Sequence, residues 1–92
     1  MNPPSEETPS LLTFPTSFPI KIMGRRTDGF AQAMVDVVMK HAPDYDPSTL
    51  EMRASREGNY LSVTVTINAT SRQQLDDLYR ALTGHPMVTM VL

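Results

Sequence analysis

The chain has 92 residues, of which 40% are apolar and 20% are charged, and its formal net charge at pH 7 is -2. A chain of this length folds around one modest core, so a single small domain is expected. The slight acidity gives no global positive field to attract nucleic acid or anionic lipid. Because the chain has no cysteine, disulfides, thiolate nucleophiles and cysteine-based metal sites are excluded.

Residues 1–13 (MNPPSEETPSLLT) contain three prolines and two glutamates and show no apolar period. This composition predicts a flexible N-terminal tail, followed by one folded domain over residues 14–92. The tail lacks the positive charge and the apolar run of a signal peptide, and no run of about 18 apolar residues occurs in the chain. We therefore expect a cytoplasmic protein without membrane association.

The first half of the domain predicts a strand, a helix and a second strand. Residues 18–24 alternate between apolar and other side chains until a glycine ends the run. Apolar residues then recur at helical spacing over residues 30–41, with Thr27 or Asp28 placed to cap the helix. Residues 50–54 alternate again and predict a strand with one charged face.

The second half predicts a long strand, a helix and a last strand. Residues 59–69 (NYLSVTVTINA) alternate strictly and follow a turn signal that contains a glycine. Thr70 and Ser71 each stand three residues before a glutamine, which is capping-box spacing, and the helix is expected to end at Gly84. Residues 87–92 (MVTMVL) form the last predicted strand.

The order strand, helix, strand, strand, helix, strand predicts an α+β fold of the ferredoxin-like split β-α-β type. Its four-stranded antiparallel sheet has the spatial order 4-1-3-2, with two helices on one face. The apolar row of the third strand must face the helices, so its hydroxyl row lies on the open face. The candidate face for a partner or ligand consists of Lys21, Met23, Glu51, Arg53, Ser62, Thr64 and Thr66.

Several longer segments resemble a known family. These are FPTSFPIKIMG at residues 14–24, KHAP at 40–43, GNYLSVTVTINAT at 58–70 and HPMVTMVL at 85–92. They resemble the YbeD-like family of small uncharacterised bacterial proteins. The resemblance implies a ferredoxin-like fold similar to the ACT regulatory domains, which bind small effectors such as amino acids. It also implies a gene context near lipoate attachment, and it supplies no established catalytic residues.

The loop at residues 24–29 (GRRTDG) offers a candidate anion site, because Gly24, Arg25 and Arg26 precede a helix N-terminus. Acylphosphatases use a comparable loop on this fold, together with an asparagine that positions water. Asn68 is the candidate partner here, on the assumption that the third strand runs parallel to the first and ends at the same edge. The loop lacks that family's spacing, and a solvated surface loop is the simpler interpretation.

A metal site is not expected. His41 and His85 lack a neighbouring Asp or Glu at metal-ligand spacing, and Asp44 and Asp46 lack further oxygen ligands for calcium. No other cofactor is indicated by the sequence.

The methionines divide between the core and the open face. Met34, Met52 and Met90 fall on inward positions, where methionine serves as core filler. Met23 and Met87 fall on or beside the open face, where they would add apolar area for a partner.

The last predicted strand, residues 87–92, is uncharged and belongs at an edge of the sheet. An edge of this kind is protected by pairing with a second copy, by cover from the N-terminal segment, or simply by being short. A homodimer through this edge is therefore one hypothesis, and a monomer is the other.

The interpretation that we favour is a non-enzymatic regulatory or interaction module, ACT-like, that binds a protein partner or a small effector. The binding surface is expected to be the open sheet face or a sheet edge. The first alternative is a small-anion-binding enzyme of acylphosphatase type that uses residues 24–29. The second is a weak RNA-binding module, which is least favoured because Tyr60 is the one aromatic near a base-stacking position.

Overall fold

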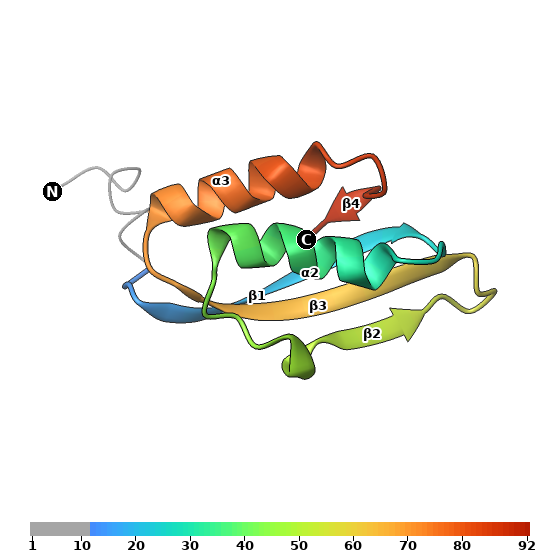
Figure 1. The fold of residues 1–92 in the computed structure, drawn as a ribbon, viewed down its shortest axis with the longest axis horizontal. Coiled ribbons are helices and arrows are strands. Elements are labelled where there is room, and N and C mark those ends of the chain that lie inside the picture. Colours follow the sequence, from blue (N-terminus) through green and yellow to red (C-terminus); the bar gives the residue numbers. More distant parts are fainter. Residues whose placement is uncertain (1–11) are drawn as a thin grey trace, which may run out of the picture.

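The structure is a computed structural model that describes residues 12–92. Along the chain its elements are β1 (Thr16–Arg25), α2 (Phe30–His41), a 3-10 turn (Pro47–Thr49), β2 (Glu51–Ala54), β3 (Tyr60–Ala69), α3 (Arg72–Thr83) and β4 (Met90–Val91) (Figure 1). The predicted order of strands and helices is confirmed. Almost all of the predicted tail, residues 1–13, lies outside the described residues, so its flexibility stays a prediction.

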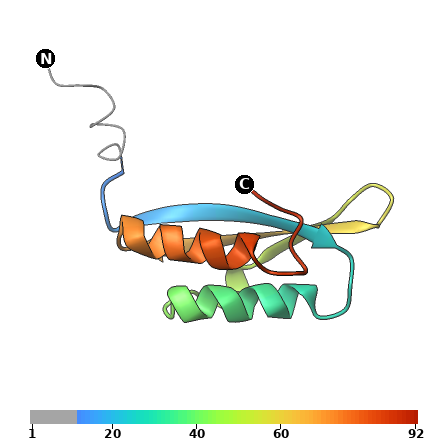
Figure 2. The same ribbon diagram turned by 90° about the horizontal axis from the view of Figure 1, so that it is seen from above.

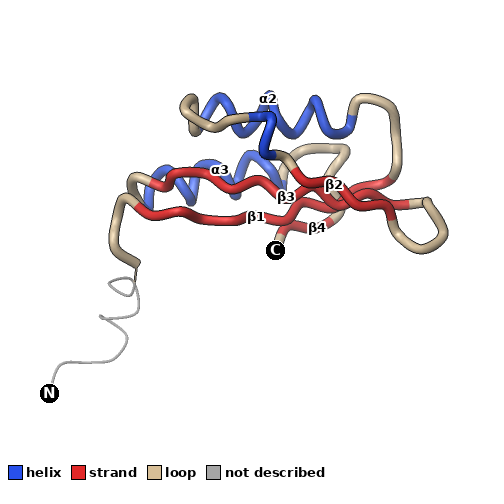
Figure 3. Tube along the Cα trace, turned by 90° about the horizontal axis from the view of Figure 1, so that it is seen from below, coloured by secondary structure: helices blue, strands red, loops and turns tan. Residues whose placement is uncertain are grey.

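The four strands form one sheet in the order β2-β3-β1-β4, and each neighbouring pair is antiparallel. Both helices lie on the same side of this sheet (Figures 2 and 3). The predicted ferredoxin-like α+β fold is therefore confirmed. No helix within residues 12–92 has the length and apolar character needed to cross a membrane.

The assumption that β3 runs parallel to β1 is wrong. In the observed register Thr16 stands opposite Ala69, and Arg25 stands opposite Tyr60. The reason is topological: β3 lies between β1 and β2, and it pairs antiparallel with both of them. The start of β1 therefore meets the end of β3.

The core lies between the sheet and the two helices. Its side chains come from alternate positions of the central strands and from the helical faces turned toward them. The largest fully buried ones are Phe30, Ile20, Ile22, Met34, Ile67, Leu78, Leu82, Val38, Val63 and Val65. The apolar row of β3 thus faces the helices as predicted, and the row of hydroxyls between these residues faces away from them.

The predicted cap of α2 is wrong, because the helix begins after Gly29 and no side chain among residues 12–92 caps it. Gly29 has φ 81, a left-handed conformation that glycine adopts without steric cost, whereas Thr27 and Asp28 precede this turn. Phe30 follows directly and is fully buried, so the turn at Gly29 places the Phe30 side chain in the core.

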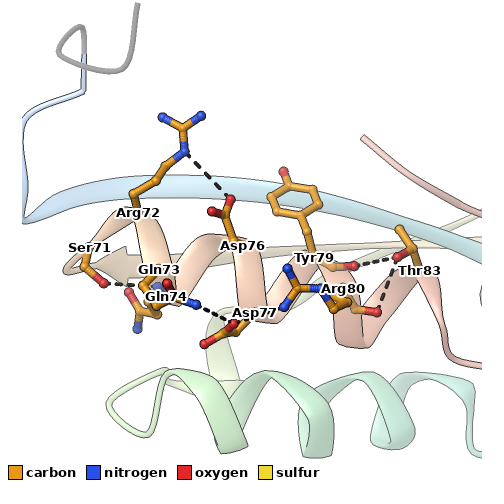
Figure 4. Close-up of polar contacts among 9 residues, drawn as sticks. All are labelled: Ser71, Arg72, Gln73, Gln74, Asp76, Asp77, Tyr79, Arg80 and Thr83. Atoms are coloured by element: carbon orange, nitrogen blue, oxygen red, sulfur yellow. Dashed lines mark hydrogen bonds and ion pairs between the residues drawn. The ribbon is translucent and has the colours of Figure 1, made fainter.

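Of the two capping pairs predicted for α3, the structure shows the one formed by Ser71 and Gln74 (Figure 4). The Ser71 hydroxyl accepts a hydrogen bond from the Gln74 backbone N–H at 3.0 Å. The Gln74 side-chain oxygen in turn accepts from the Thr70 N–H at 2.7 Å. The helix ends at Gly84, as predicted.

Two methionines and the last strand differ from the predictions. Met34 is fully buried, but Met52 and Met90 are 56% and 50% exposed. Met52 lies on β2, the edge strand of the sheet formed by the described residues, with no strand of that sheet on its outer side. β4 has only two residues because the segment before it turns: the Val88 N–H donates to the His85 carbonyl at 3.1 Å. Met90 consequently pairs with Met23 on the open face.

Candidate functional site

The open face of the sheet carries two rows of side chains that run across the strands. One row joins Lys21 of β1, Thr64 of β3 and Glu51 of β2. The adjacent row joins Met23, Ser62 and Arg53 in the same strand order. Strand alternation puts all six on the face away from the helices, so these six of the seven predicted residues form a contiguous surface.

Five of the seven candidate residues line one shallow depression with a volume of about 320 Å³. It is bounded by Lys21, Glu51, Met52, Arg53, Ser62 and Thr64. We call this the open-face depression. Its central strand contributes hydroxyls, and its flanking strands contribute charges.

The charges around the open-face depression are not neutralised by one another. Lys21 and Glu51 stand at opposite ends of a row and are separated by two strand spacings, about 10 Å between backbones. The two ion pairs found within residues 12–92 both lie along α3 (Figure 4). The side chains of Lys21, Glu51 and Arg53 therefore remain available to a bound molecule.

The other two candidate residues lie beside this depression. Met23 lines a small apolar hollow of about 200 Å³ together with Tyr60 and Leu61. Thr66 lines a separate depression at the far end of β3.

Gly24, the first residue of the predicted anion loop, has a packing role. It is buried at the end of β1, and a Cβ placed on it would collide with the Met87 carbonyl oxygen and the Phe30 ring, whose Cζ would be 2.9 Å away. Glycine is required here because the backbone of the 85–88 turn and a core aromatic ring both approach the strand closely.

The other residues of the predicted anion site are not brought together. The Arg25 guanidinium carbon lies 5.8 Å from the centre of the Tyr60 ring, in cation–π geometry. The Arg26 N–H donates to the Asn59 carbonyl at 2.9 Å. Asn68 stands opposite Ser17, at the other end of β3, about 26 Å from Tyr60 at the usual rise of about 3.3 Å per residue. The proposed pairing of Asn68 with the arginines is therefore wrong.

His41 and His85 both take part in hydrogen bonds that involve the backbone. His85 Nδ1 accepts a hydrogen bond from the Met87 N–H at 3.1 Å, and the His41 carbonyl accepts one from the Gln74 side chain at 2.9 Å. Within the described residues, no group of three or more His, Cys, Asp or Glu side chains is placed to hold a metal ion.

Sequence reasoning missed Tyr45, which is only 4% exposed although it lies in the connection between α2 and β2. Within residues 12–92 its hydroxyl makes no hydrogen bond of good geometry. Burial raises the pKa of the phenol above 10.0, the nearby Thr49 hydroxyl opposes this shift, and the Asp46 carboxylate adds to it. The only signal in the sequence was an aromatic residue between two aspartates, which is equally typical of a solvated loop.

Asp46 is the cap of the 3-10 turn that follows it. Its Oδ1 accepts from the Ser48 hydroxyl at 2.8 Å and from the Ser48 backbone N–H at 3.0 Å. These hydrogen bonds, first from the hydroxyl and then from the backbone, lower the pKa of Asp46 below 3.8. The carboxylate is therefore anionic at neutral pH.

Comparison with known proteins identifies close relatives over nearly the whole chain. A family model described as "Protein of unknown function (DUF493)" matches residues 9–92. A UPF0250 protein of Bordetella pertussis is 55% identical over 91 residues, which cover 99% of this chain and 98% of the relative. A UPF0250 protein of Nitrosomonas europaea is 59% identical over 83 residues, covering 90% and 95%.

Solved structures share the fold at low sequence identity. The ACT domain from GTP pyrophosphokinase of Chlorobium tepidum superposes with a TM-score of 0.65 at 19% identity, covering 84% of this chain and 83% of that one. A protein from H. pylori superposes with a TM-score of 0.71 at 9% identity, covering 100% and 97%. The fold is ACT-like, and the chain belongs to the UPF0250 (DUF493) family of bacterial proteins, which its sequence motifs had indicated as the YbeD-like family.

Proposed function

We propose that this protein is a non-enzymatic ACT-like module that binds a small zwitterionic effector, of the size and charge of an amino acid, in the open-face depression. The observation that carries the proposal is the placement of three charged side chains, Lys21, Glu51 and Arg53, around the hydroxyls of Ser62 and Thr64. None of the three forms an ion pair within residues 12–92.

The chemistry of the depression matches both ends of a zwitterion. Lys21 and Arg53 supply donors for a carboxylate, and Glu51 supplies an acceptor for an ammonium group. The backbone separation of about 10 Å between Lys21 and Glu51 leaves room between their side chains for a small molecule. Ser62 and Thr64 can donate to or accept from the remaining polar atoms of such a ligand.

The ACT-like fold supports the same proposal. The solved ACT domain similar to this chain comes from a GTP pyrophosphokinase, so the same fold occurs there as a domain of an enzyme. A small module of this shape is suited to sensing a ligand, because its sheet presents a rigid surface on which side chains are held at fixed spacing.

The test is a screen of the standard amino acids and small dicarboxylates by thermal shift, followed by calorimetric titration of those that stabilise the protein. A ligand that binds the folded state raises the midpoint of unfolding. Loss of one exposed charge pair is worth up to about 1 kcal/mol, so Lys21→Gln or Glu51→Gln should weaken binding by about fivefold.

Matched controls are available on the helix side and in the hairpin turn. Lys40→Gln removes an exposed lysine of α2, and Glu57→Gln removes an exposed glutamate of the turn. Both should bind the effector as the unmodified protein does. If no zwitterion stabilises the protein, or if Lys40→Gln weakens binding as much as Lys21→Gln does, the open-face depression is not an effector site. Hydrolysis of an acyl phosphate by the purified protein would contradict its non-enzymatic assignment.

The β4 edge supports a second part of this proposal, which is association of two copies. Val91 stands opposite Ile22 between hydrogen-bonded positions, because Leu92 and Lys21 exchange both backbone hydrogen bonds at 2.8 and 3.2 Å. In an antiparallel ladder the N–H and C=O of Val91 then point outward, where another strand can pair with them. Met90 and Leu92 are 50% and 62% exposed beside this edge and would be covered by the second copy.

A further inference from the structure

A second depression, with a volume of about 370 Å³, lies where β2 no longer covers β3. β2 begins at Glu51, opposite Thr64, so the last part of β3 has the connection between α2 and β2 beside it instead of a strand. The lining residues are Ser17, Asp44, Tyr45, Asp46, Thr49, Thr66, Ile67 and Asn68. We call this the acidic depression.

The uncovered edge of β3 contributes backbone groups to it. Pro19 stands opposite Thr66 and has no N–H, so this pair is not hydrogen-bonded, and Thr66 directs its N–H and C=O away from β1. Asn68 shares this orientation, since it lies two residues further along the strand. Within residues 12–92 neither residue makes a backbone–backbone hydrogen bond on that side.

The charge of the acidic depression is negative. Asp44 and Asp46 line it, and no lysine or arginine does. Ser48 donates to Oδ1 of Asp46, whose Oδ2 accepts no hydrogen bond from the described part of the chain, and the Asn68 amide donates to Asp44 Oδ2 at 3.4 Å. Two carboxylates and the carbonyls of an open strand edge together form a concentration of hydrogen-bond acceptors.

The Tyr45 hydroxyl is an independent indication that a ligand belongs here. The residue is 4% exposed, and within residues 12–92 its hydroxyl makes no hydrogen bond of good geometry, although the Thr49 hydroxyl lies close to it. Thr49 and Asp46, the two groups that act on this phenol, both line the depression, so the hydroxyl end of the ring lies at it. Thr49 donates its own hydroxyl proton to the Asp46 carbonyl at 2.6 Å. A buried hydroxyl without a partner costs about 1–3 kcal/mol, and a ligand that hydrogen-bonds to it removes this cost.

The chemistry points to an organic cation. A metal ion would require several anionic or imidazole ligands, and residues 12–92 contain no group of three such side chains suitably placed. An ammonium group carries one positive charge and three N–H donors, which suit two carboxylates, a phenol oxygen and strand carbonyls. We propose that the acidic depression binds a primary alkylammonium group, independently of the effector proposed for the open face.

The test follows the backbone amides of nitrogen-labelled protein by NMR while n-butylammonium chloride is added, with sodium chloride at matched ionic strength as the reference. Thr66 and Asn68 should shift saturably with the amine only. Asp44→Asn should weaken binding about fivefold, which is the effect of losing one partly exposed charge pair. Asp28→Asn removes an exposed carboxylate at the start of α2 and should leave the affinity unchanged.

Tyr45→Phe separates a ligand role from a structural one. If the hydroxyl serves the ligand, this variant should bind butylammonium more weakly and yet unfold at a higher temperature, because the unpartnered hydroxyl is gone. A variant with unchanged affinity, or one that is less stable, would remove the hydroxyl from the site and overturn the proposal.

Two further probes distinguish the source of the amine. Putrescine represents a free small amine, and Nα-acetyl-lysine methylamide represents a lysine side chain as a partner protein would present it. Saturation by either supports the proposal, and the tighter one names the source. The proposal fails if neither saturates, if Asp44→Asn binds as tightly as the unmodified protein, or if magnesium chloride binds more tightly than the amines.

Discussion

Replacement of Gly24 by alanine should destabilise the protein through a steric collision at the end of β1. The added Cβ would collide with the carbonyl oxygen of Met87 and the ring of Phe30. The ring is 1% exposed and packed among core residues, and a backbone carbonyl cannot rotate away as a flexible side chain would. Overpacking of this kind costs about 1–3 kcal/mol, which for a domain of this size lowers the midpoint of thermal unfolding by about 5–20 °C.

The assay is thermal and urea unfolding followed by circular dichroism, with Gly29→Ala as the matched control. Apart from the adjacent residues, a Cβ on Gly29 would meet no atom of residues 12–92 within 4 Å, so this variant tests only the φ of 81. That conformation costs alanine about 1 kcal/mol. If Gly24→Ala unfolds at the midpoint of the unmodified protein, or is less affected than Gly29→Ala, then Gly24 is not a packing residue and its place in the 24–29 loop needs another explanation.

Three other substitutions test separate parts of the structure. Ser71→Ala should lower the free energy of unfolding by about 1 kcal/mol, because the cap of α3 is lost; equal urea midpoints would contradict the observed hydrogen bond. The raised pKa of Tyr45 means that folding favours the neutral phenol, so the associated stability is fully present below about pH 10 and is lost as the pH rises through the folded value. Tyr45→Phe should therefore lose less stability than the unmodified protein between pH 9 and 11, and parallel pH profiles would contradict the assignment. Met90→Lys should convert any dimer to monomer in light scattering, because a charge blocks pairing at the β4 edge, and an unchanged mass would exclude that edge.

Most of the fold could be predicted because its signals are local. The alternation in β3 and the helical spacing in α2 and α3 depend on residues close together in the chain, and the order of elements then permits few topologies. The cap at Ser71 and the end at Gly84 were likewise predictable from short patterns. The start of α2 after Gly29, rather than at Thr27, could not be predicted from a short pattern. It depends on the burial of Phe30 in the core, which is a tertiary feature.

The candidate site was predicted in part, for a related reason. Strand alternation alone assigns Lys21, Ser62 and Arg53 to the open face. The pairing of Asn68 with the arginines failed because it assumed that the first and third strands are parallel, whereas neighbours in the predicted antiparallel order 4-1-3-2 run in opposite directions. Tyr45 was missed because its burial results from a connection folding over the end of the sheet, and no periodicity marks a single residue in a connection.

The register of β2 has a consequence for how the open face can change. β2 is held against β3 through a tight hairpin, in which the Ser55 N–H donates to the Tyr60 carbonyl at 2.9 Å and Gly58 has φ 77. A shift of one residue in this hairpin would turn Glu51 and Arg53 toward the helices and bring Met52 to the open face. The two charges that β2 contributes to that surface are thus held there by the length of a distant turn, and an insertion or deletion in the turn would remove them while Lys21, Ser62 and Thr64 stay in place.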